Sequence, residues 1–108
     1  MGVNNITILG NIGKDPVKRE TSSGMTIAAF SVAVSERIKG EDSTTWFNCT
    51  AFGSKAEYIL RSCQKGSGVF VEGPHRKEIY QEKERWTIMV NNIVVYNNRK
   101  PGNDHAKN

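Results

Sequence analysis

The chain has 108 residues, of which 37% are hydrophobic and 24% charged, and 15 lysines and arginines against 11 acidic residues give a formal charge of +4. This length allows one domain with a modest core, and the composition excludes collagen-like and obviously disordered chains. With no membrane-length apolar run and no signal-peptide pattern, we expect a cytoplasmic protein, and its small positive charge permits a polyanionic partner.

The first half of the chain alternates apolar and polar side chains with the two-residue period of β-strands. We predict strands over 4–9, 25–35 and 45–52, turns over 14–16 and 21–24, and an exposed charged loop over 36–44. The third strand has two different faces. One is apolar and suits a core, with Phe47, Cys49 and Ala51. The other suits a solvated platform, with Trp46, Asn48, Thr50 and Phe52.

The second half of the chain contains one helix among further strands. Ser54 to Glu57 fits a capping box, apolar residues then recur at helical spacing up to Cys63, and Gly66 suits a C-cap. After this helix we predict a fourth strand over 68–72, an extended stretch over 76–81, a hairpin tip over 81–85 and a fifth strand over 86–95.

The order of these elements predicts an all-β fold with one short helix. Three strands, a helix and two strands are the arrangement of the OB-fold, a five-stranded Greek-key barrel with its helix between strands 3 and 4. We expect this domain over residues 1–97 and a disordered tail over 98–108. The fold leaves the ligand open, because OB barrels bind oligonucleotides, sugars and proteins.

Catalytic chemistry is not indicated by the sequence. Cys49 and Cys63 have neither the spacing nor the histidine partners of a zinc site, and we expect both to be buried, reduced thiols. The nearest approach to a carboxylate cluster, Glu36 with Glu41 and Asp42, is typical of a solvated loop. We therefore predict a protein that is not an enzyme and that needs no metal or cofactor.

Seven motifs in the same order resemble the bacterial-type single-stranded DNA-binding proteins. They are NITILG over 5–10, GKDP over 13–16 with the Arg19 and Gly24 that follow it, AAFSVAVS over 28–35, WFNCTAFG over 46–53, Ala56-Glu57, KGS over 65–67 and VEG over 71–73. The resemblance implies an OB-fold that wraps single-stranded DNA without strong sequence preference. It also implies protection of that DNA in replication, recombination and repair, usually by a homotetramer, with a dimer as the other possibility.

Candidate residues for base stacking follow from this resemblance. Trp46 and Phe52 match the family's stacking tryptophan and phenylalanine, and Tyr80 matches a further stacking tryptophan. Ile38 stands where many members have a tryptophan, so stacking there is expected to be weaker. An aromatic side chain stacks any base, because every base has a π-face.

Core packing is the alternative for each of these side chains. The polar neighbours Asn48 and Thr50 argue against it for Trp46, whereas Phe52 adjoins the start of the helix. For Trp86, a further stacking candidate, the polar flanks favour a platform, and Ile88 on the same face favours packing.

Backbone contacts require cations along the path of the DNA. Six basic residues in loops or at strand ends are our candidates for phosphate pairing: Arg19, Arg37, Lys39, Lys65, Arg76 and Lys77. Lys65 and Arg76 match basic positions of the family. Simple solvation is the alternative for any one of them.

The C-terminal segment departs from the family pattern. Members that act in genome replication usually end in an acidic tip that recruits partner enzymes, whereas 99–108 carries three cations and one carboxylate. Replication proteins are therefore possible partners, but not through such a tip. The second hypothesis is an OB-fold accessory protein similar to the primosomal replication proteins, which act mainly through protein contacts, and the aromatic residues argue against it.

Overall fold

The computed structural model describes residues 1–98, so the expected tail, apart from Asn98, lies outside the described residues. The described part contains eight strands and one helix. They are β1 (Ile6–Ile12), β2 (Val17–Glu20), β3 (Thr26–Ile38), β4 (Glu41–Phe52), α1 (Ser54–Ser62), β5 (Gly68–Gly73), β6 (His75–Tyr80), β7 (Lys83–Met89) and β8 (Asn92–Asn97).

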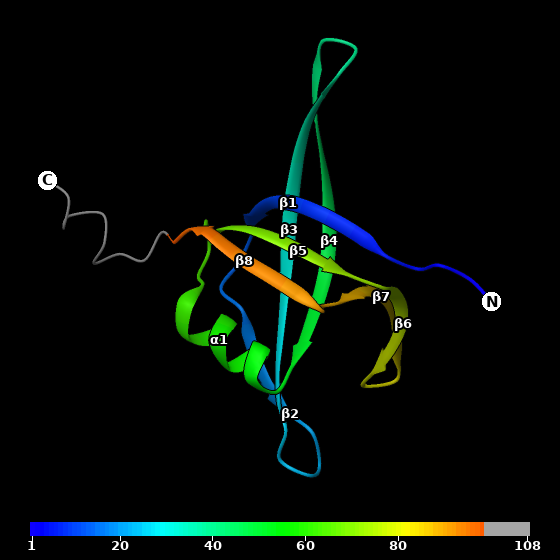
Figure 1. Ribbon diagram of the computed structural model, residues 1–108, viewed down its shortest axis with the longest axis vertical. Coiled ribbons are helices and arrows are strands. Elements are labelled where there is room, and N and C mark those ends of the chain that lie inside the picture. The colour runs from blue at the N-terminus through cyan, green and yellow to red at the C-terminus, as the bar shows by residue number, and fades with distance from the viewer. Residues whose placement is uncertain (99–108) are drawn as a thin grey trace, which may run out of the picture.

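The strands form a barrel that the last two strands close. β1 pairs antiparallel with β3 and β5, β3 pairs with β4, and β5 pairs with β8 (Figure 1). β7 runs parallel to β4, with Cys49 opposite Ile88. Where β7 continues into β8, the N–H of Val90 donates to the carbonyl of Thr50 and the N–H of Asn91 donates to that of Glu72. The chain therefore changes partner here from β4 to β5, which closes an OB-type barrel and confirms the predicted fold class.

The core lies inside this barrel and under the helix. Alternate strand residues point inward, and α1 packs its buried Ala56 and Ile59 against β3 and β4. Cys49 and Cys63 are both buried thiols that form no disulfide, as predicted. Burial raises the pKa of the Cys49 thiol to about 12, so this thiol stays protonated at neutral pH.

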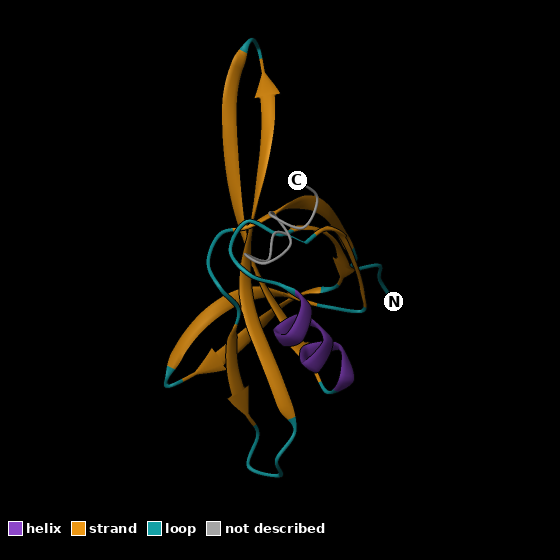
Figure 2. Cartoon of the chain, turned by 90° about the vertical axis from the view of Figure 1, so that its left-hand side faces the viewer, coloured by secondary structure: helices purple, strands orange, loops and turns teal. Residues whose placement is uncertain are grey.

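The prediction of a loop over 36–44 is wrong. β3 and β4 remain paired up to Ile38 opposite Glu41 and form a long arm that projects from the barrel (Figures 1 and 2). Only Lys39 and Gly40 make the turn, both with positive φ, which suits the twist of a two-residue hairpin. The polarity of this segment reflects solvent on both faces of a two-stranded ribbon, and it does not reflect a loss of strand structure.

The strand count and the helix ends also differ from the predictions. β2 is an additional strand, the extended stretch predicted over 76–81 forms β6, and the fifth strand is divided at residues 90–91 into β7 and β8. No side chain caps α1, because Gly53 occupies the N-cap with φ 66°, a conformation that favours glycine. The helix ends at Ser62, so Gly66 is no C-cap, and its N–H donates to the carbonyl of Ile12. The hairpin tip is confined to Gln81 and Glu82, since β7 begins at Lys83.

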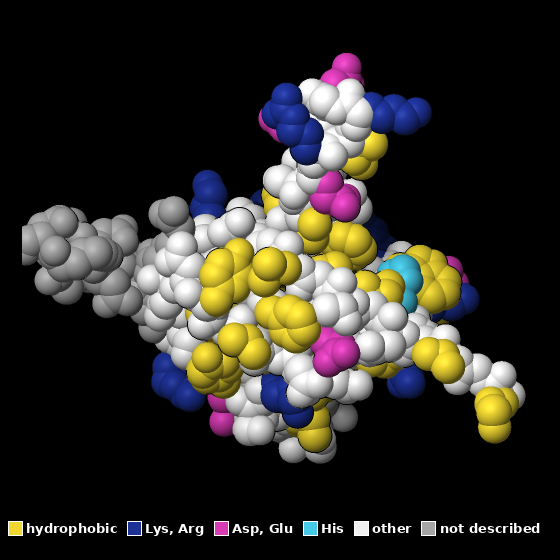
Figure 3. Space-filling view, turned by 45° about the horizontal axis from the view of Figure 1, so that its top comes forward, with side chains coloured by type: hydrophobic (Ala, Val, Ile, Leu, Met, Phe, Trp, Pro, Cys, Tyr) yellow, Lys and Arg dark blue, Asp and Glu magenta, His cyan; other side chains and the backbone are white. Residues whose placement is uncertain are grey.

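An apolar surface covers the outer face of β1, β5 and β8. Leu9 lies opposite Phe70, and Phe70 lies opposite Val94, so the three side chains form one row across the sheet. Tyr96 lies over Gly68, where any larger side chain would collide with its ring. Hydrophobic side chains gather on this face in the space-filling view (Figure 3). We call the surface formed by Leu9, Phe70, Val94 and Tyr96 the outer apolar face.

Glu72 lies on β5 beside the outer apolar face. The side-chain amides of Asn92 and Asn5 donate hydrogen bonds of 3.0 Å to its two carboxylate oxygens. These hydrogen bonds lower the pKa of Glu72, since they favour its charged form. Glu72 thereby connects the start of the chain to β8.

Candidate nucleic-acid interface

A cleft of about 380 Å³ opens on the outer side of β3 and β4. Ser31 and Asn48, which lie opposite one another on these strands, contribute to its lining. The charged and aromatic residues that line the cleft around them are Lys14, Asp15, Lys18, Arg19, Tyr80 and Arg85. This combination of cations, an aromatic ring and short polar side chains suits one unit of a nucleic acid strand, with its phosphate, base and sugar.

Trp46 lies next to this cleft. Its side chain is 61% exposed, and its indole ring rests on Gly13, where a Cβ atom would collide with the ring. Gly13 directly precedes Lys14, and Ser31 is also close to this position, so the indole is at the rim of the cleft. The exposure excludes the alternative in which Trp46 is a core residue of the isolated chain.

The hairpin of β6 and β7 forms one wall of the cleft and has two different faces. Glu78 lies opposite Arg85 and Tyr80 opposite Lys83, so these side chains share one face. Trp86, opposite Lys77, is on the reverse face, because successive strand residues alternate. Only the Tyr80 face is directed toward the cleft.

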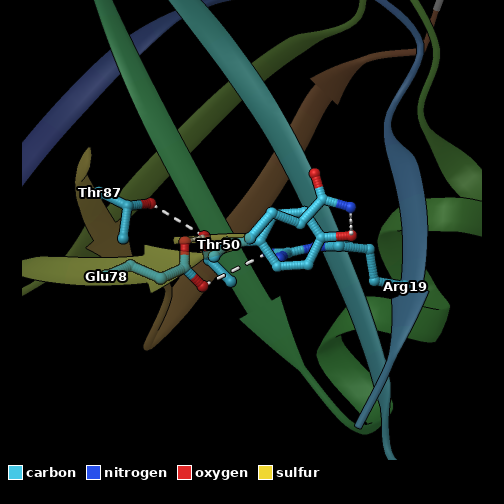
Figure 4. A network of polar contacts seen from close by, with 6 residues as sticks. Arg19, Thr50, Glu78 and Thr87 are labelled. Atoms are coloured by element: carbon cyan, nitrogen blue, oxygen red, sulfur yellow. Dashed lines mark hydrogen bonds and ion pairs between the residues drawn. The ribbon is translucent and has the colours of Figure 1, made fainter. Parts of the chain in front are cut away.

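Polar contacts fasten this hairpin to the barrel (Figure 4). Glu78 accepts an ion-paired hydrogen bond of 3.3 Å from Arg19 on β2 and one of 3.4 Å from the hydroxyl of Thr50 on β4. Thr50 and Thr87 share a further hydrogen bond of 2.9 Å. The hairpin therefore covers Thr50 completely, and the prediction that Thr50 lies on a solvated platform is wrong.

The sequence of this chain matches a known family over almost its whole length. The profile of the single-strand binding protein family matches residues 3–99. The chain belongs to the single-strand binding protein family. Single-stranded DNA-binding protein B of Bacillus subtilis (strain 168) is 33% identical over 95 residues, which cover 85% of this chain and 84% of that protein. The chain thus matches most of the length of one relative.

Two other relatives within the single-strand binding protein family are longer. Single-stranded DNA-binding protein 1 of Chlorobaculum tepidum is 34% identical over 77 residues, 67% of this chain and 48% of that protein. The single-stranded DNA-binding protein of Xanthomonas axonopodis pv. citri is 32% identical over 111 residues, 94% of this chain and 62% of that protein. The chain therefore spans about half to three fifths of the length of these two members.

The residues expected to stack bases in this family member are divided among separate surfaces. Tyr80 lines the cleft, and Trp46 lies at its rim. Phe52 is exposed at the end of β4, opposite Ile27 and beyond the covered Thr50. Ile38 is exposed near the tip of the arm.

Trp86 is 56% exposed on the reverse face of the hairpin. Its ring centroid is 5.2 Å from that of His75, with which it packs at a tilted angle. Neither this face nor Ile88, which is fully buried, forms part of the cleft. Trp86 therefore lies outside the surface that contains Trp46 and Tyr80.

The cations expected to pair with phosphates also differ in their surroundings. Arg37 forms an exposed ion pair with Asp42 on the arm, near Lys39 at its tip, and Lys77 forms one with Glu84. The backbone N–H of Lys65 donates to Asp15, a cleft residue, over 2.8 Å. Arg76 shares the hairpin face of Tyr80 but does not line the cleft. Arg19 is nearly buried.

Three cleft cations were missed in the sequence. Lys14 was assigned only to a turn, although it belongs to the GKDP motif that carried the family resemblance. Lys18 is on β2, a strand that was not predicted, and Arg85 was assigned to the hairpin tip. Across residues 1–98, no three of the His, Cys, Asp and Glu side chains are grouped so that they could hold a metal ion. No helix in the same range has the length and hydropathy to cross a membrane.

Proposed function

We propose that this member of the single-strand binding protein family binds single-stranded DNA without sequence preference and protects it in replication, recombination and repair in the cytoplasm. The observation that carries this proposal is an exposed tryptophan, Trp46, at the rim of a cleft lined by cations and by Tyr80. Bases stack on the two rings, and Lys14, Lys18 and Arg85 pair with the phosphates that pass through the cleft.

The DNA continues from the cleft along the outer side of β4 toward Phe52. Trp46 and Phe52 are six positions apart, which corresponds to about 20 Å along a strand. This distance separates different bases. Thr50 lies on β4 between these two rings and is covered by the hairpin, so the DNA does not reach Thr50 on its way from Trp46 to Phe52.

Copies of the chain associate through the β1 side of the barrel. The side chains of the outer apolar face are neighbours and are not scattered singly over the surface. A contiguous apolar patch of this kind is typical of a protein–protein interface. β1 pairs with β3 only at Asn11 and Ile12, so its first residues offer an open strand edge within the described chain. A second copy of the chain pairs with this edge, and a third copy covers the outer apolar face. These two different interfaces together give a tetramer.

Tryptophan fluorescence tests the binding proposal. The chain has two tryptophans, so Trp46→Phe leaves Trp86 alone and Trp86→Phe leaves Trp46 alone. Titration with oligo-dT should quench Trp46 at the end point of binding, and oligo-dA and oligo-dC should compete within an order of magnitude. Light scattering on the same samples gives the mass. If the chain self-associates but binds no oligonucleotide, the result would favour the primosomal-type accessory function.

A further inference from the structure

Arg19 lines the cleft, but its guanidinium is engaged by contacts within the chain. Its side chain is 13% exposed, and its Nη2 atom is 3.3 Å from Oε2 of Glu78, which is itself 16% exposed. The centre of its guanidinium lies 4.0 Å from the centroid of the Tyr80 ring. Its Nε atom is buried without a hydrogen-bond partner. The guanidinium is therefore already held between a carboxylate and an aromatic ring.

Glu78 is fixed from a second side. Its other carboxylate oxygen accepts the hydrogen bond from Thr50, and Thr50 contacts Thr87 of the same hairpin (Figure 4). The contacts thus run from β2 through β6 to β4 and β7 without a break. Glu78 and Tyr80 are two residues apart and share one face of β6, so a single guanidinium reaches both.

This arrangement determines how Tyr80 can receive a base. The Arg19 guanidinium covers one face of the ring, so a base can stack only on the opposite face. Tyr80 keeps 38% of its surface exposed and lines the cleft. A planar guanidinium that is itself held by a carboxylate fixes the orientation of the ring before the DNA arrives.

We infer that Arg19 is a positioning residue of the DNA interface, which together with Glu78 orients the Tyr80 ring for stacking, and that it is not a phosphate contact. This inference rests on the proposed function, since it concerns the same cleft. It replaces the role in phosphate pairing that the sequence predicts for Arg19. It also gives an acidic residue, Glu78, a favourable role in binding a polyanion.

Variants of the pair separate the two roles of Arg19, with binding to labelled oligo-dT measured between low and moderate salt. If Arg19 contacted a phosphate, Arg19→Gln would lower the magnitude of the log–log salt slope by about 0.7, whereas Arg19→Lys would largely preserve the contact. We expect instead that both variants weaken binding by about 3- to 30-fold with the slope unchanged, because lysine lacks the planar group that packs on the ring.

Glu78→Gln should change the DNA affinity in the direction opposite to the one that simple electrostatics predicts. Removing a carboxylate near the DNA should tighten binding if only charge matters, whereas loss of positioning weakens it. The matched control is Glu84→Gln, the same change on the reverse face of the same hairpin, which should leave binding unchanged or slightly tighter. The double variant Arg19→Gln, Glu78→Gln keeps the net charge and leaves neither charge unpaired, so it tests the inference even if a single variant folds poorly.

The Tyr80→Ala background completes the test. Stacking of one base predicts a loss of about 5- to 150-fold for Tyr80→Ala alone. Adding Arg19→Gln to it should cause no further loss, because the two residues act through one ring. Additive losses, a reduced salt slope, or tighter binding by Glu78→Gln would overturn the inference while leaving the proposed function intact. A native chain that fails to bind oligo-dT would overturn the proposed function itself.

Discussion

Replacing Trp46 with alanine tests the stacking surface directly, because binding and stability should respond differently. With 61% of the side chain exposed, folding buries roughly 100 Å² of it, equivalent to at most about 2.5 kcal/mol of stability at about 25 cal/mol per Å². Loss of one stacked base should weaken oligo-dT binding by about 1 to 3 kcal/mol. Fluorescence anisotropy of a labelled oligo-dT measures the dissociation constant, and far-UV circular dichroism with thermal melting measures the fold.

Trp86→Ala is the matched control for this experiment. It removes the chain's other tryptophan, which has a similar exposure of 56% but lies on the reverse face of the hairpin. We expect it to weaken binding less than Trp46→Ala. If Trp46→Ala unfolds the domain, Trp46 supports the core and the stacking argument fails. A folded Trp46→Ala variant that binds like the native chain would refute the argument as well.

The other predictions concern charge, assembly, acid and the tail. Lys14→Ala and Arg85→Ala should each reduce the salt slope of binding by about 0.7, measured by titration at several salt concentrations, and unchanged slopes would move the phosphate path elsewhere. Val94→Glu on the outer apolar face should lower the mass found by light scattering, and an unchanged mass would exclude this face as an interface. Since the pKa of Glu72 is lowered in the folded state, its stabilisation is present above the ordinary carboxyl pKa and is lost as the pH falls through the folded value. The difference in melting temperature between Glu72→Gln and the native chain should therefore shrink below about pH 4. Deletion after Asn98 removes three cations and one carboxylate and should leave oligo-dT affinity equal or slightly lower, whereas tighter binding would mean that the tail competes with DNA.

Periodicity in the sequence was sufficient for the features that depend on neighbours along the chain. The alternation of Phe47, Cys49 and Ala51 identified the core face of β4, and the helical spacing that includes Ile59 identified α1. The arm was missed because its residues over 36–44 are polar or charged apart from Ile38 and the turn glycine, so it lacks the alternating apolar signal on which strand prediction depends. The same alternation put Trp46 on the solvated face of β4, and the family motifs added its role in stacking.

The rest of the site depends on contacts between distant parts of the chain. Arg19 meets Glu78 across 59 positions, and Thr50 meets Thr87 across 37. No local sequence pattern predicts that a hairpin covers Thr50 or that Arg19 forms an ion pair with a carboxylate. A basic residue in a loop and one held in an ion pair look the same in sequence, and the pairing is determined only by the way the barrel closes.

The change of partner at Val90 and Asn91 affects how the chain is made as well as how it is closed. During synthesis, β4 and β5 emerge before the segment that joins them, so both strands have an unpaired edge until β7 and β8 follow. Such edges readily pair with other chains. Barrel closure is also a long-range event, which slows folding relative to local pairing. A nascent chain therefore cannot complete its barrel until residue 97, the end of β8, has emerged from the ribosome. Until then the chain is most exposed to aggregation.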